Sequence, residues 1–280
     1  MNPTTPPTTH SNEGFETWDE PPRPPDEHDR IEELMTFDFQ KIEEDLQFIV
    51  EVTQKLINWD GVAISTIERD AQILQVKMIK SDSLWVGNIY PRKLLCAWTI
   101  LGPSAILVED ADRDPRFQHH KIVTEKGMKS YIGVPLTTTE GHNIGTFCVW
   151  SDRPRKVDEH ERLYMKCMAA IIVTLLEIQR RRLKIKPCYT QRMEPQEWTA
   201  ASPPKVQPGL AEALVALIVR HLESIDGVEV DETCDNFASV AHFFEDKGVL
   251  NRVEFAQKLI EIGSRSSMAL LWKIQKATVR

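Results

Sequence analysis

Residues 130–150 read SYIGVPLTTTEGHNIGTFCVW, and this stretch decides the fold. Apolar side chains dominate residues 130–136 and 143–150, which predicts two strands. The polar segment TTTEGH separates them, and its Gly141 suits a tight turn between antiparallel neighbours. The stretch therefore predicts a β-hairpin.

A second hairpin is predicted nearer the N-terminus. Residues 61–79 alternate between apolar and polar side chains about a polar centre, which is the pattern of a hairpin with one buried face. Between the two hairpins, residues 91–100 resemble a short helix with Pro91 in its first turn. Residues 104–110 predict one further strand.

Two long helices are predicted to flank these strands. Residues 30–58 place apolar side chains at two heptad positions, which indicates either a coiled-coil seam or the core face of a helix on a sheet. Residues 157–186 are apolar on two helical faces, so this helix needs two packing partners. The order of elements predicts an α+β fold, with one antiparallel sheet and helices on its faces.

Six short motifs follow one another between the long helices. They are Cys96-Ala97-Trp98-Thr99-Ile100, Val108-Glu109-Asp110-Ala111, Asp114-Pro115-Arg116-Phe117, Gly133-Val134-Pro135-Leu136, Ile144-Gly145-Thr146-Phe147-Cys148-Val149 and Arg153-Pro154-Arg155. In this order they resemble the GAF domain family, in particular the GAF modules of bacterial-type sensor kinases and cyclases. The resemblance is close over residues 92–155 and extends with the flanking helices to 30–186. It implies a central antiparallel sheet, helices on both faces, and a pocket beneath the segments that cover the sheet.

The candidate function of that pocket is to bind a small molecule. Aromatic walls with a few polar groups are the usual composition of such sites. The candidate ligand-binding residues are Trp85, Cys96, Trp98, Asp110, Asp112, Phe117, His120 and Tyr131. The alternative, that the aromatic side chains are simply core residues, stays open. The sequence identifies neither the ligand nor a cofactor, because similar GAF frameworks hold unrelated molecules.

Cys96 is the candidate for covalent chemistry. Relatives of this fold that attach a linear tetrapyrrole typically have a histidine after the cysteine, whereas Ala97 follows here. GAF-type methionine sulfoxide reductases need several redox cysteines, and only Cys96 and Cys148 lie in the matching core. Burial in its strand is expected to raise the pKa of Cys148 and reduce its nucleophilicity. The adjacent His119-His120 do not by themselves make a metal site, and no catalytic motif is recognised, so we expect no enzyme activity.

Charge and proline are unevenly distributed along the 280 residues. Residues 1–60 carry 15 Asp/Glu against 4 Lys/Arg, so the rest of this −8 chain is close to neutral and lacks the basic footprint of a nucleic-acid binder. Seven of the 17 prolines lie in residues 1–29 and five in 187–208, which predicts a disordered tail and a linker. Residues 209–280 have no proline and a helical period, which predicts a small all-α module.

Several sequence features bear on the cellular compartment of the protein. The five cysteines form no CxxC pair and no secretory signal precedes them, which favours the cytoplasm, with the nucleus as the alternative. No apolar stretch approaches the length that a membrane span requires. The basic run from Arg180 to Lys186 complements the helix dipole, or else serves as a nuclear-targeting or nucleic-acid contact.

Three functional hypotheses follow. The first is a non-catalytic GAF-like sensor that binds a small molecule and signals through its flanking helices. The second is a ligand-free scaffold, with a homodimer through helices 30–58 and 157–186 and a protein partner on 209–280. The third is an enzyme or chromophore protein that depends on Cys96.

Overall fold

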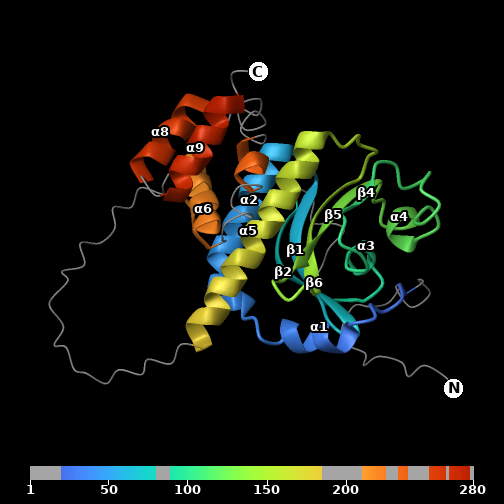
Figure 1. Cartoon of the computed structure of the whole chain (residues 1–280). Helices are drawn as coiled ribbons and strands as arrows, with labels where there is room; N and C mark the ends of the chain where they lie inside the picture. The colour runs from blue at the N-terminus through green and yellow to red at the C-terminus, as the bar shows by residue number, and fades with distance from the viewer. Residues whose placement is uncertain are drawn as a thin grey trace.

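The computed structural model describes residues 20–79, 89–184, 210–224, 233–238, 252–262 and 265–277. A six-stranded antiparallel sheet forms its centre, in the order β3-β2-β1-β6-β5-β4 (Figure 1). The strands are β1 (Gly61–Ile67), β2 (Ala71–Ile79), β3 (Ile89–Pro91), β4 (Ile106–Val108), β5 (Ser130–Thr137) and β6 (Asn143–Ser151). The predicted α+β fold class is confirmed.

Both predicted hairpins are present and lie side by side. β1 pairs with β2, and β5 pairs with β6 across a turn in which Gly141 has a φ of 93°. This left-handed conformation favours glycine, as the sequence indicated. β1 also pairs with β6, with Ala63 opposite Cys148, so the two hairpins join at the centre of the sheet.

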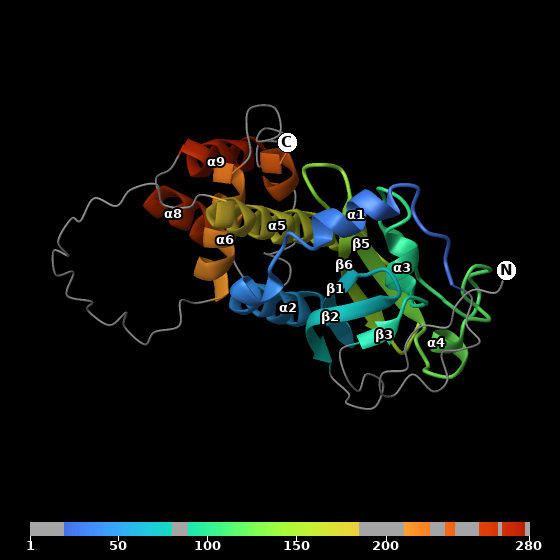
Figure 2. The same cartoon turned by 90° about the horizontal axis from the view of Figure 1, so that it is seen from below.

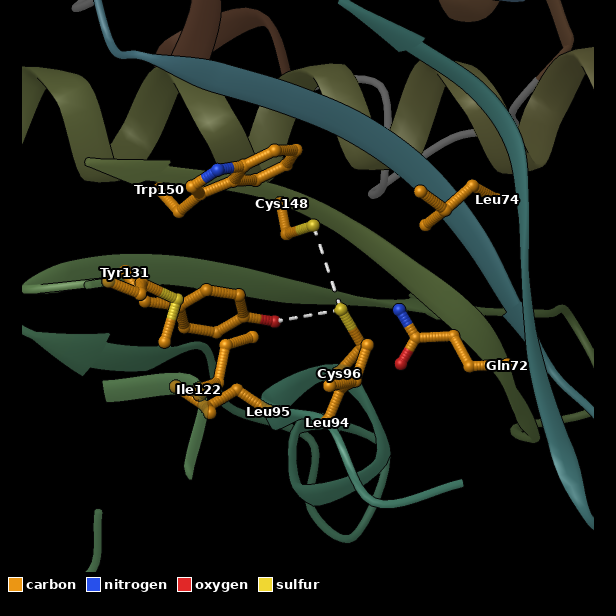
Figure 3. A pocket seen from close by; sticks show the side chains of 10 residues that line it. Gln72, Leu74, Leu94, Leu95, Cys96, Ile122, Tyr131, Cys148 and Trp150 are labelled. Carbon is orange, nitrogen blue, oxygen red and sulfur yellow. Dashed lines mark hydrogen bonds between the residues drawn. The ribbon is translucent and has the colours of Figure 1, made fainter. Parts of the chain in front are cut away.

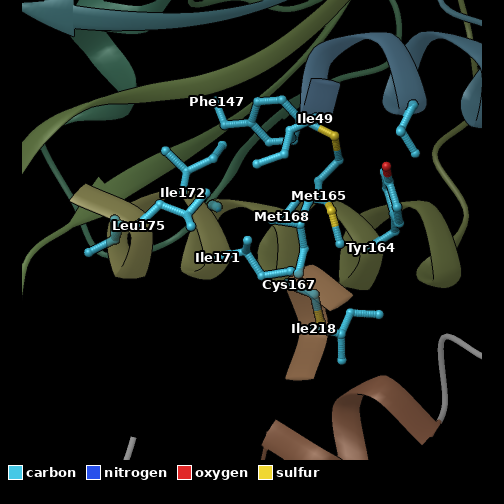
Figure 4. Packing of buried hydrophobic residues seen from close by; sticks show 14 of the residues in the cluster. Ile49, Phe147, Tyr164, Met165, Cys167, Met168, Ile171, Ile172, Leu175 and Ile218 are labelled. Carbon is cyan, nitrogen blue, oxygen red and sulfur yellow. The ribbon is translucent and has the colours of Figure 1, made fainter. Parts of the chain in front are cut away.

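Two long helices, α2 (Glu43–Ile57) and α5 (Glu159–Lys184), cover one side of the sheet (Figure 2). Because side chains alternate along a strand, every second residue points to this side. Figure 4 shows Ile49 of α2 and Phe147 of β6 directed towards α5. We call this side the helix face, and its buried strand residues include Val62, Ile64, Ile132, Val134, Phe147 and Val149.

The predicted helix over 30–58 is interrupted, so the single-helix prediction was wrong. The structure has α1 (Glu27–Leu34), a 3-10 turn η1 (Phe39–Ile42) and then α2. Between α1 and η1, the ring of Phe37 packs 4.6 Å from the guanidinium of Arg180 on α5. Such tertiary packing outweighs local helical period, which is a weak determinant on its own.

Arg180 also centres an ion cluster that ties α1 to α5. Its Nη1 lies 3.0 Å from a carboxylate oxygen of Glu33, and its Nη2 lies 2.7 Å from Glu177 and 3.1 Å from Glu140 in the β5–β6 turn. Because Arg180 is nearly buried, losing this guanidinium would leave two buried carboxylates without their cation. This member of the basic run therefore has a structural role inside the fold.

The chain before α1 is part of the folded domain. The buried Arg92 donates from Nη1 to the carbonyl oxygen of Pro21 at 3.2 Å. A buried guanidinium needs acceptors, and carbonyl groups of the proline-rich segment supply them. The predicted end of the tail at residue 29 is thus too late, since residues 20–29 lie on the domain. Residues 1–19 and the predicted linker 187–208 lie outside the described residues.

The described C-terminal helices are α6 (Leu210–Ser224), residues 233–238, α8 (Arg252–Ile262) and α9 (Arg265–Ala277). Of these, α6 packs against the outer side of α5, and α8 and α9 pack against α6. Thr174 Oγ1 on α5 lies 2.7 Å from Nδ1 of His221 on α6, and Figure 4 shows Ile218 of α6 beside Cys167. The two apolar faces of α5 predicted two packing partners, and these partners are the sheet and α6. Among the described helices, none combines the length and apolar composition that crossing a bilayer requires.

Candidate functional site

The other side of the sheet carries small, aromatic and sulfur-containing side chains. Two short helices, α3 (Leu95–Thr99) and α4 (Lys121–Thr124), cover it. We call this side the cavity face, and its strand residues include Gly61, Ala63, Tyr131, Gly133, Cys148 and Trp150. It therefore differs in composition from the helix face of the same strands.

Two glycines give the aromatic side chains room to lie along the sheet. A Cβ atom on Gly133 would lie 2.2 Å from the hydroxyl oxygen of Tyr131, and one on Gly61 would lie 2.1 Å from the ring of Trp150. Neither contact is physically tolerable, so both aromatic positions depend on the missing side chains. The Tyr131 hydroxyl thereby reaches the residues of α3.

The short helix α3 begins later than predicted. Pro91 ends β3 instead of opening a helix, and the helical residues start at Leu95. The reason is pairing, because Pro91 lies opposite Ala71 at the edge of the sheet, where proline is tolerated. Thr146 on β6 then fixes α3 by donating from Oγ1 to the carbonyl oxygen of Cys96 at 3.2 Å.

A cavity lies between the cavity face and the helices that cover it (Figure 3). The centre of a water-sized molecule can occupy about 20 Å³ of it. That is room for roughly one such molecule. Its lining is mostly apolar and consists of Gln72, Leu74, Leu94, Leu95, Cys96, Ile122, Met128, Tyr131, Cys148 and Trp150.

Two thiols and a phenol meet in this cavity. The sulfur atoms of Cys96 and Cys148 are 3.6 Å apart, and Tyr131 donates its hydroxyl hydrogen to Cys96 Sγ at 3.4 Å (Figure 3). The Tyr131 oxygen is also 3.0 Å from Thr99 Oγ1. Burial raises the pKa of Tyr131, so its hydroxyl keeps the proton that it donates.

The two thiols have different acidities. Hydrogen bonding from Cys148 and then from Tyr131 lowers the pKa of Cys96 to about 7, against burial, which would raise it; Ser65 and Gln72 contribute in the same direction. The pKa of Cys148 is raised by its hydrogen bond with Cys96, by burial and by a negative charge on Cys96, all of which disfavour a second thiolate. The expected raised pKa of Cys148 is thus present, and Cys96 is the more acidic of the two thiols.

Two buried polar atoms beside Cys96 are unsatisfied. The carboxamide oxygen of Gln72 and the hydroxyl oxygen of Ser65 have no hydrogen-bond partner of normal geometry among the described residues. Both residues are almost completely buried. Buried polar atoms are nearly always hydrogen-bonded in proteins. Of these two residues, Gln72 lines the cavity, so its carboxamide oxygen is available to a molecule bound there.

The structure brings only part of the predicted site together. Cys96 and Tyr131 line the cavity, and Trp85 lies outside the described residues. Trp98 and Phe117 are not part of the lining. They pack edge to face with their ring centroids 6.0 Å apart, so their role is packing, one of the two readings left open.

The polar candidates lie away from the cavity because local contacts use them. Asp112 pairs with Lys129 at 2.8 Å, and Asp110 Oδ1 accepts from the Asp112 backbone N–H at 3.2 Å. The imidazole of His120 caps α4 by accepting from the Ile122 backbone N–H at 3.3 Å, and its Nε2 lies 2.7 Å from a backbone carbonyl oxygen. These contacts stabilise loops.

Sequence reasoning missed most of the lining. Cys148 and Trp150 are two residues apart on one strand and lie directly opposite Gly133 and Tyr131 on the next. The alternation of β6 and the register of the hairpin could have placed these residues on one face. Gln72 gave no comparable signal, because its position depends on how β2 pairs with β1.

The domain consists of an antiparallel sheet with long helices on one face and a small cavity on the other. The sequence model of the GAF domain family matches residues 41–176. This part of the chain is a GAF domain, and the predicted resemblance is confirmed.

Curated relatives include a cyclic di-GMP phosphodiesterase of Pseudomonas aeruginosa. It is 31% identical over 139 residues, which are 48% of this chain and 23% of the relative. The chain therefore spans about a quarter of the length of that relative.

Similar solved structures include a free methionine-R-sulfoxide reductase from Neisseria meningitidis in complex with its substrate. It is 20% identical, with a TM-score of 0.43, and the match covers 55% of this chain and 87% of that one. Another is the blue-light-absorbing form of the PixJ GAF domain of Thermosynechococcus elongatus. Its identity is 10% and its TM-score 0.42, with coverage of 52% and 93%.

Proposed function

We propose that this chain is a non-catalytic regulatory protein whose GAF domain binds a small molecule in the cavity beneath α3 and α4. The observation that carries the proposal is the buried, unsatisfied carboxamide oxygen of Gln72 in the cavity wall beside Cys96. A ligand with a hydrogen-bond donor would satisfy it. An apolar lining with a few convergent polar groups is the usual composition of a binding site.

The arrangement of β6 supports a route from the cavity to the helices. Cys148 lies in the cavity wall, whereas its neighbours Phe147 and Val149 point to the opposite face, against α2 and α5. A shift of β6 on ligand binding would therefore move residues that contact α5. Through the Thr174–His221 contact, α5 would carry the shift to α6.

The positions of the carboxylates and the imidazole support a role other than acid–base catalysis. The carboxylates of Asp110 and Asp112 and the imidazole of His120 lie outside the cavity lining and make local contacts. The phosphodiesterase relative matches over only 23% of its length, so its named activity remains a property of that protein.

Native mass spectrometry of the full chain as purified tests this proposal, with a variant that fills the cavity. Leu74 lines the cavity, so Leu74→Trp would occupy it, while Leu74→Met nearly preserves the volume and serves as the control. Thermal shifts with amino acids, cyclic mono- and dinucleotides, haem and linear tetrapyrroles extend the search to ligands whose binding would require α3 and α4 to move away from the sheet, because the cavity has room for roughly one water-sized molecule. We expect a bound mass or a shift that Leu74→Met keeps and Leu74→Trp removes. No bound mass and no shift with any of these compounds would overturn the proposal.

The scaffold hypothesis has its own supporting observation. Ile260 and Ile262 of α8 and Met268 of α9 are large apolar residues with exposed side chains. Exposed apolar side chains on a helical module are suited to contact with a protein partner. Light scattering of Ile260→Glu tests this hypothesis. Weaker self-association of the variant would show that the partner is a second copy of the chain and that Ile260 contacts it.

The predicted homodimer through the two long helices stays a prediction. Ile171 and Leu175 of α5 are buried within the chain, so substituting them would disturb the core as well as any dimer. Met35 is 66% exposed at the end of α1, and Met35→Glu is the cleaner test. An unchanged mass in light scattering would count against a dimer that uses this helix end. The cytoplasm stays the proposed compartment, with the nucleus as the alternative, because the four described cysteines are all free and buried.

A further inference from the structure

Cys96 and Cys148 come from different elements and face each other across the cavity. Their sulfur atoms are 3.6 Å apart, and the α3 backbone that carries Cys96 is held to β6 by the Thr146 hydroxyl. A disulfide requires a separation of about 2.05 Å, so the sulfur atoms need to approach by roughly 1.5 Å. We propose that Cys96 and Cys148 form a redox-active dithiol that small hydroperoxides oxidise to a disulfide.

The reaction has two steps, and its atoms balance. The Cys96 thiol gives up its proton as its sulfur attacks the terminal oxygen of the hydroperoxide. The O–O bond breaks, and the leaving alkoxide or hydroxide takes up the proton that Cys96 released. Cys96 then carries a sulfenic acid. The Cys148 sulfur attacks the Cys96 sulfur, the S–O bond breaks, and the hydroxyl group leaves as water with the Cys148 proton. The dithiol has lost two electrons to the peroxide, and an external thiol reverses the change.

The surroundings assign the two roles. Tyr131 donates to Cys96 Sγ and stabilises a thiolate there, and this contact favours Cys96 as the attacking group. Cys148 contacts the same sulfur and is placed to resolve the sulfenic acid. Cys167 offers a contrast, because burial against α6 raises its pKa to about 12.

The size and polarity of the cavity fit the smallest oxidants. It has room for roughly one water-sized molecule, and hydrogen peroxide is only slightly larger. Gln72 offers an unsatisfied carboxamide oxygen in the cavity wall beside the reacting sulfur, where it can orient the peroxide by accepting a hydrogen bond. The disulfide would join α3 to β6 across the cavity. Its formation does not require the ligand proposed above, but the peroxide would compete with that ligand for the same space.

The test uses the full chain carrying Cys188→Ser. Cys188 lies outside the described residues, and the substitution removes its thiol from the assay. Under native conditions, stoichiometric hydrogen peroxide should remove two thiols, lower the intact mass by two hydrogen atoms and give a Cys96–Cys148 disulfide in peptide mapping. In the same background, Cys148→Ser should accumulate a Cys96 sulfenic acid that dimedone traps. Cys96→Ser should slow peroxide consumption about tenfold or more. A rise of one unit in the pKa of the attacking thiol lowers its thiolate fraction by about tenfold. Cys167→Ser is the matched control and should react like the parent.

A disulfide between other cysteines, or undiminished peroxide consumption by Cys96→Ser, would overturn the proposal. Thiols that stay reduced in the folded parent would do so as well. Tyr131→Phe keeps the ring and removes only the hydroxyl donor, so this variant should fold like the parent. It should raise the pH midpoint of Cys96 oxidation while the thermal transition stays cooperative. An unchanged midpoint would contradict the role of the phenol.

Discussion

The two faces of the sheet carry different side chains. The helix face is closely packed, whereas the cavity face lines a small cavity. Phe147 and Val149 point to the helix face and pack among aliphatic side chains of α2 and α5. Cys148 and Trp150, their immediate neighbours, point to a small cavity with polar atoms. The difference shows that alternate residues of the same strand can serve stability and chemistry separately. Loss of apolar volume should be costly on the helix face, and changes on the cavity face should chiefly alter chemistry.

The largest expected effect distinguishes neighbouring residues of β6. Phe147→Ala should lower the free energy of unfolding by about 3–5 kcal/mol, because a fully buried ring leaves a cavity in a closely packed core. Cys148→Ala should cost about 1 kcal/mol, since few atoms are removed beside an existing cavity. Urea denaturation measures both. Equal losses would break the distinction between the faces.

A smaller effect concerns the outer side of α5. Burial lowers the pKa of His221 to about 4, below its unfolded value of about 6.5. The unfolded chain therefore binds more protons between these values, and stability should fall as pH falls from about 6.5 to 4, by at most about 3 kcal/mol. Denaturation across this range tests the prediction. His221→Gln should flatten that part of the profile, and an identical slope in the variant would contradict it.

Gly133→Ala should lower the free energy of unfolding by roughly 1–3 kcal/mol, because the new Cβ overlaps the Tyr131 hydroxyl and Thr99 Oγ1. Tyr131→Ala removes the nearer of these obstacles. In a double-mutant cycle, the cost of Gly133→Ala should shrink in the Tyr131→Ala background. Strictly additive costs would show that the glycine does not serve the tyrosine.

The smallest effect is a shift in reactivity with little change in stability. Because the pKa of Cys96 is lowered to about 7, its alkylation rate should rise with pH through about 7, compared with about 8.5 for an ordinary thiol. Cys167 should stay unreactive over this range, since its pKa is raised to about 12. Peptide-resolved iodoacetamide labelling measures both. Equal labelling of the two cysteines would remove the chemical contrast between the faces.

The sheet could be predicted from the sequence because its signals are local. Alternation of apolar and polar side chains indicated the hairpin at 61–79, and the turn at Gly141 between two apolar segments indicated the hairpin at 130–150. Six ordered motifs indicated the GAF domain. The break between α1 and α2 could not be predicted in this way. It depends on Phe37 meeting Arg180, far along the chain, while the apolar period continues unbroken.

The site was predictable only in part for a similar reason. Cys96 and Tyr131 could be nominated from their motif and residue types. The approach of Cys148 to Cys96 depends on how α3 lies over β6, which no local pattern specifies. Asp110, Asp112 and His120 had the residue types of a binding site, but neighbouring groups in their own loops use them.

The central claim is that the cavity face, and not the helix face, is where a small molecule binds. A crystal structure of the full chain as purified, under reducing conditions, tests this claim most directly. We predict electron density for a bound molecule within hydrogen-bond distance of Gln72 Oε1 and beside Cys96 Sγ. A cavity without density, with the Gln72 side chain turned to a protein partner, would contradict the account.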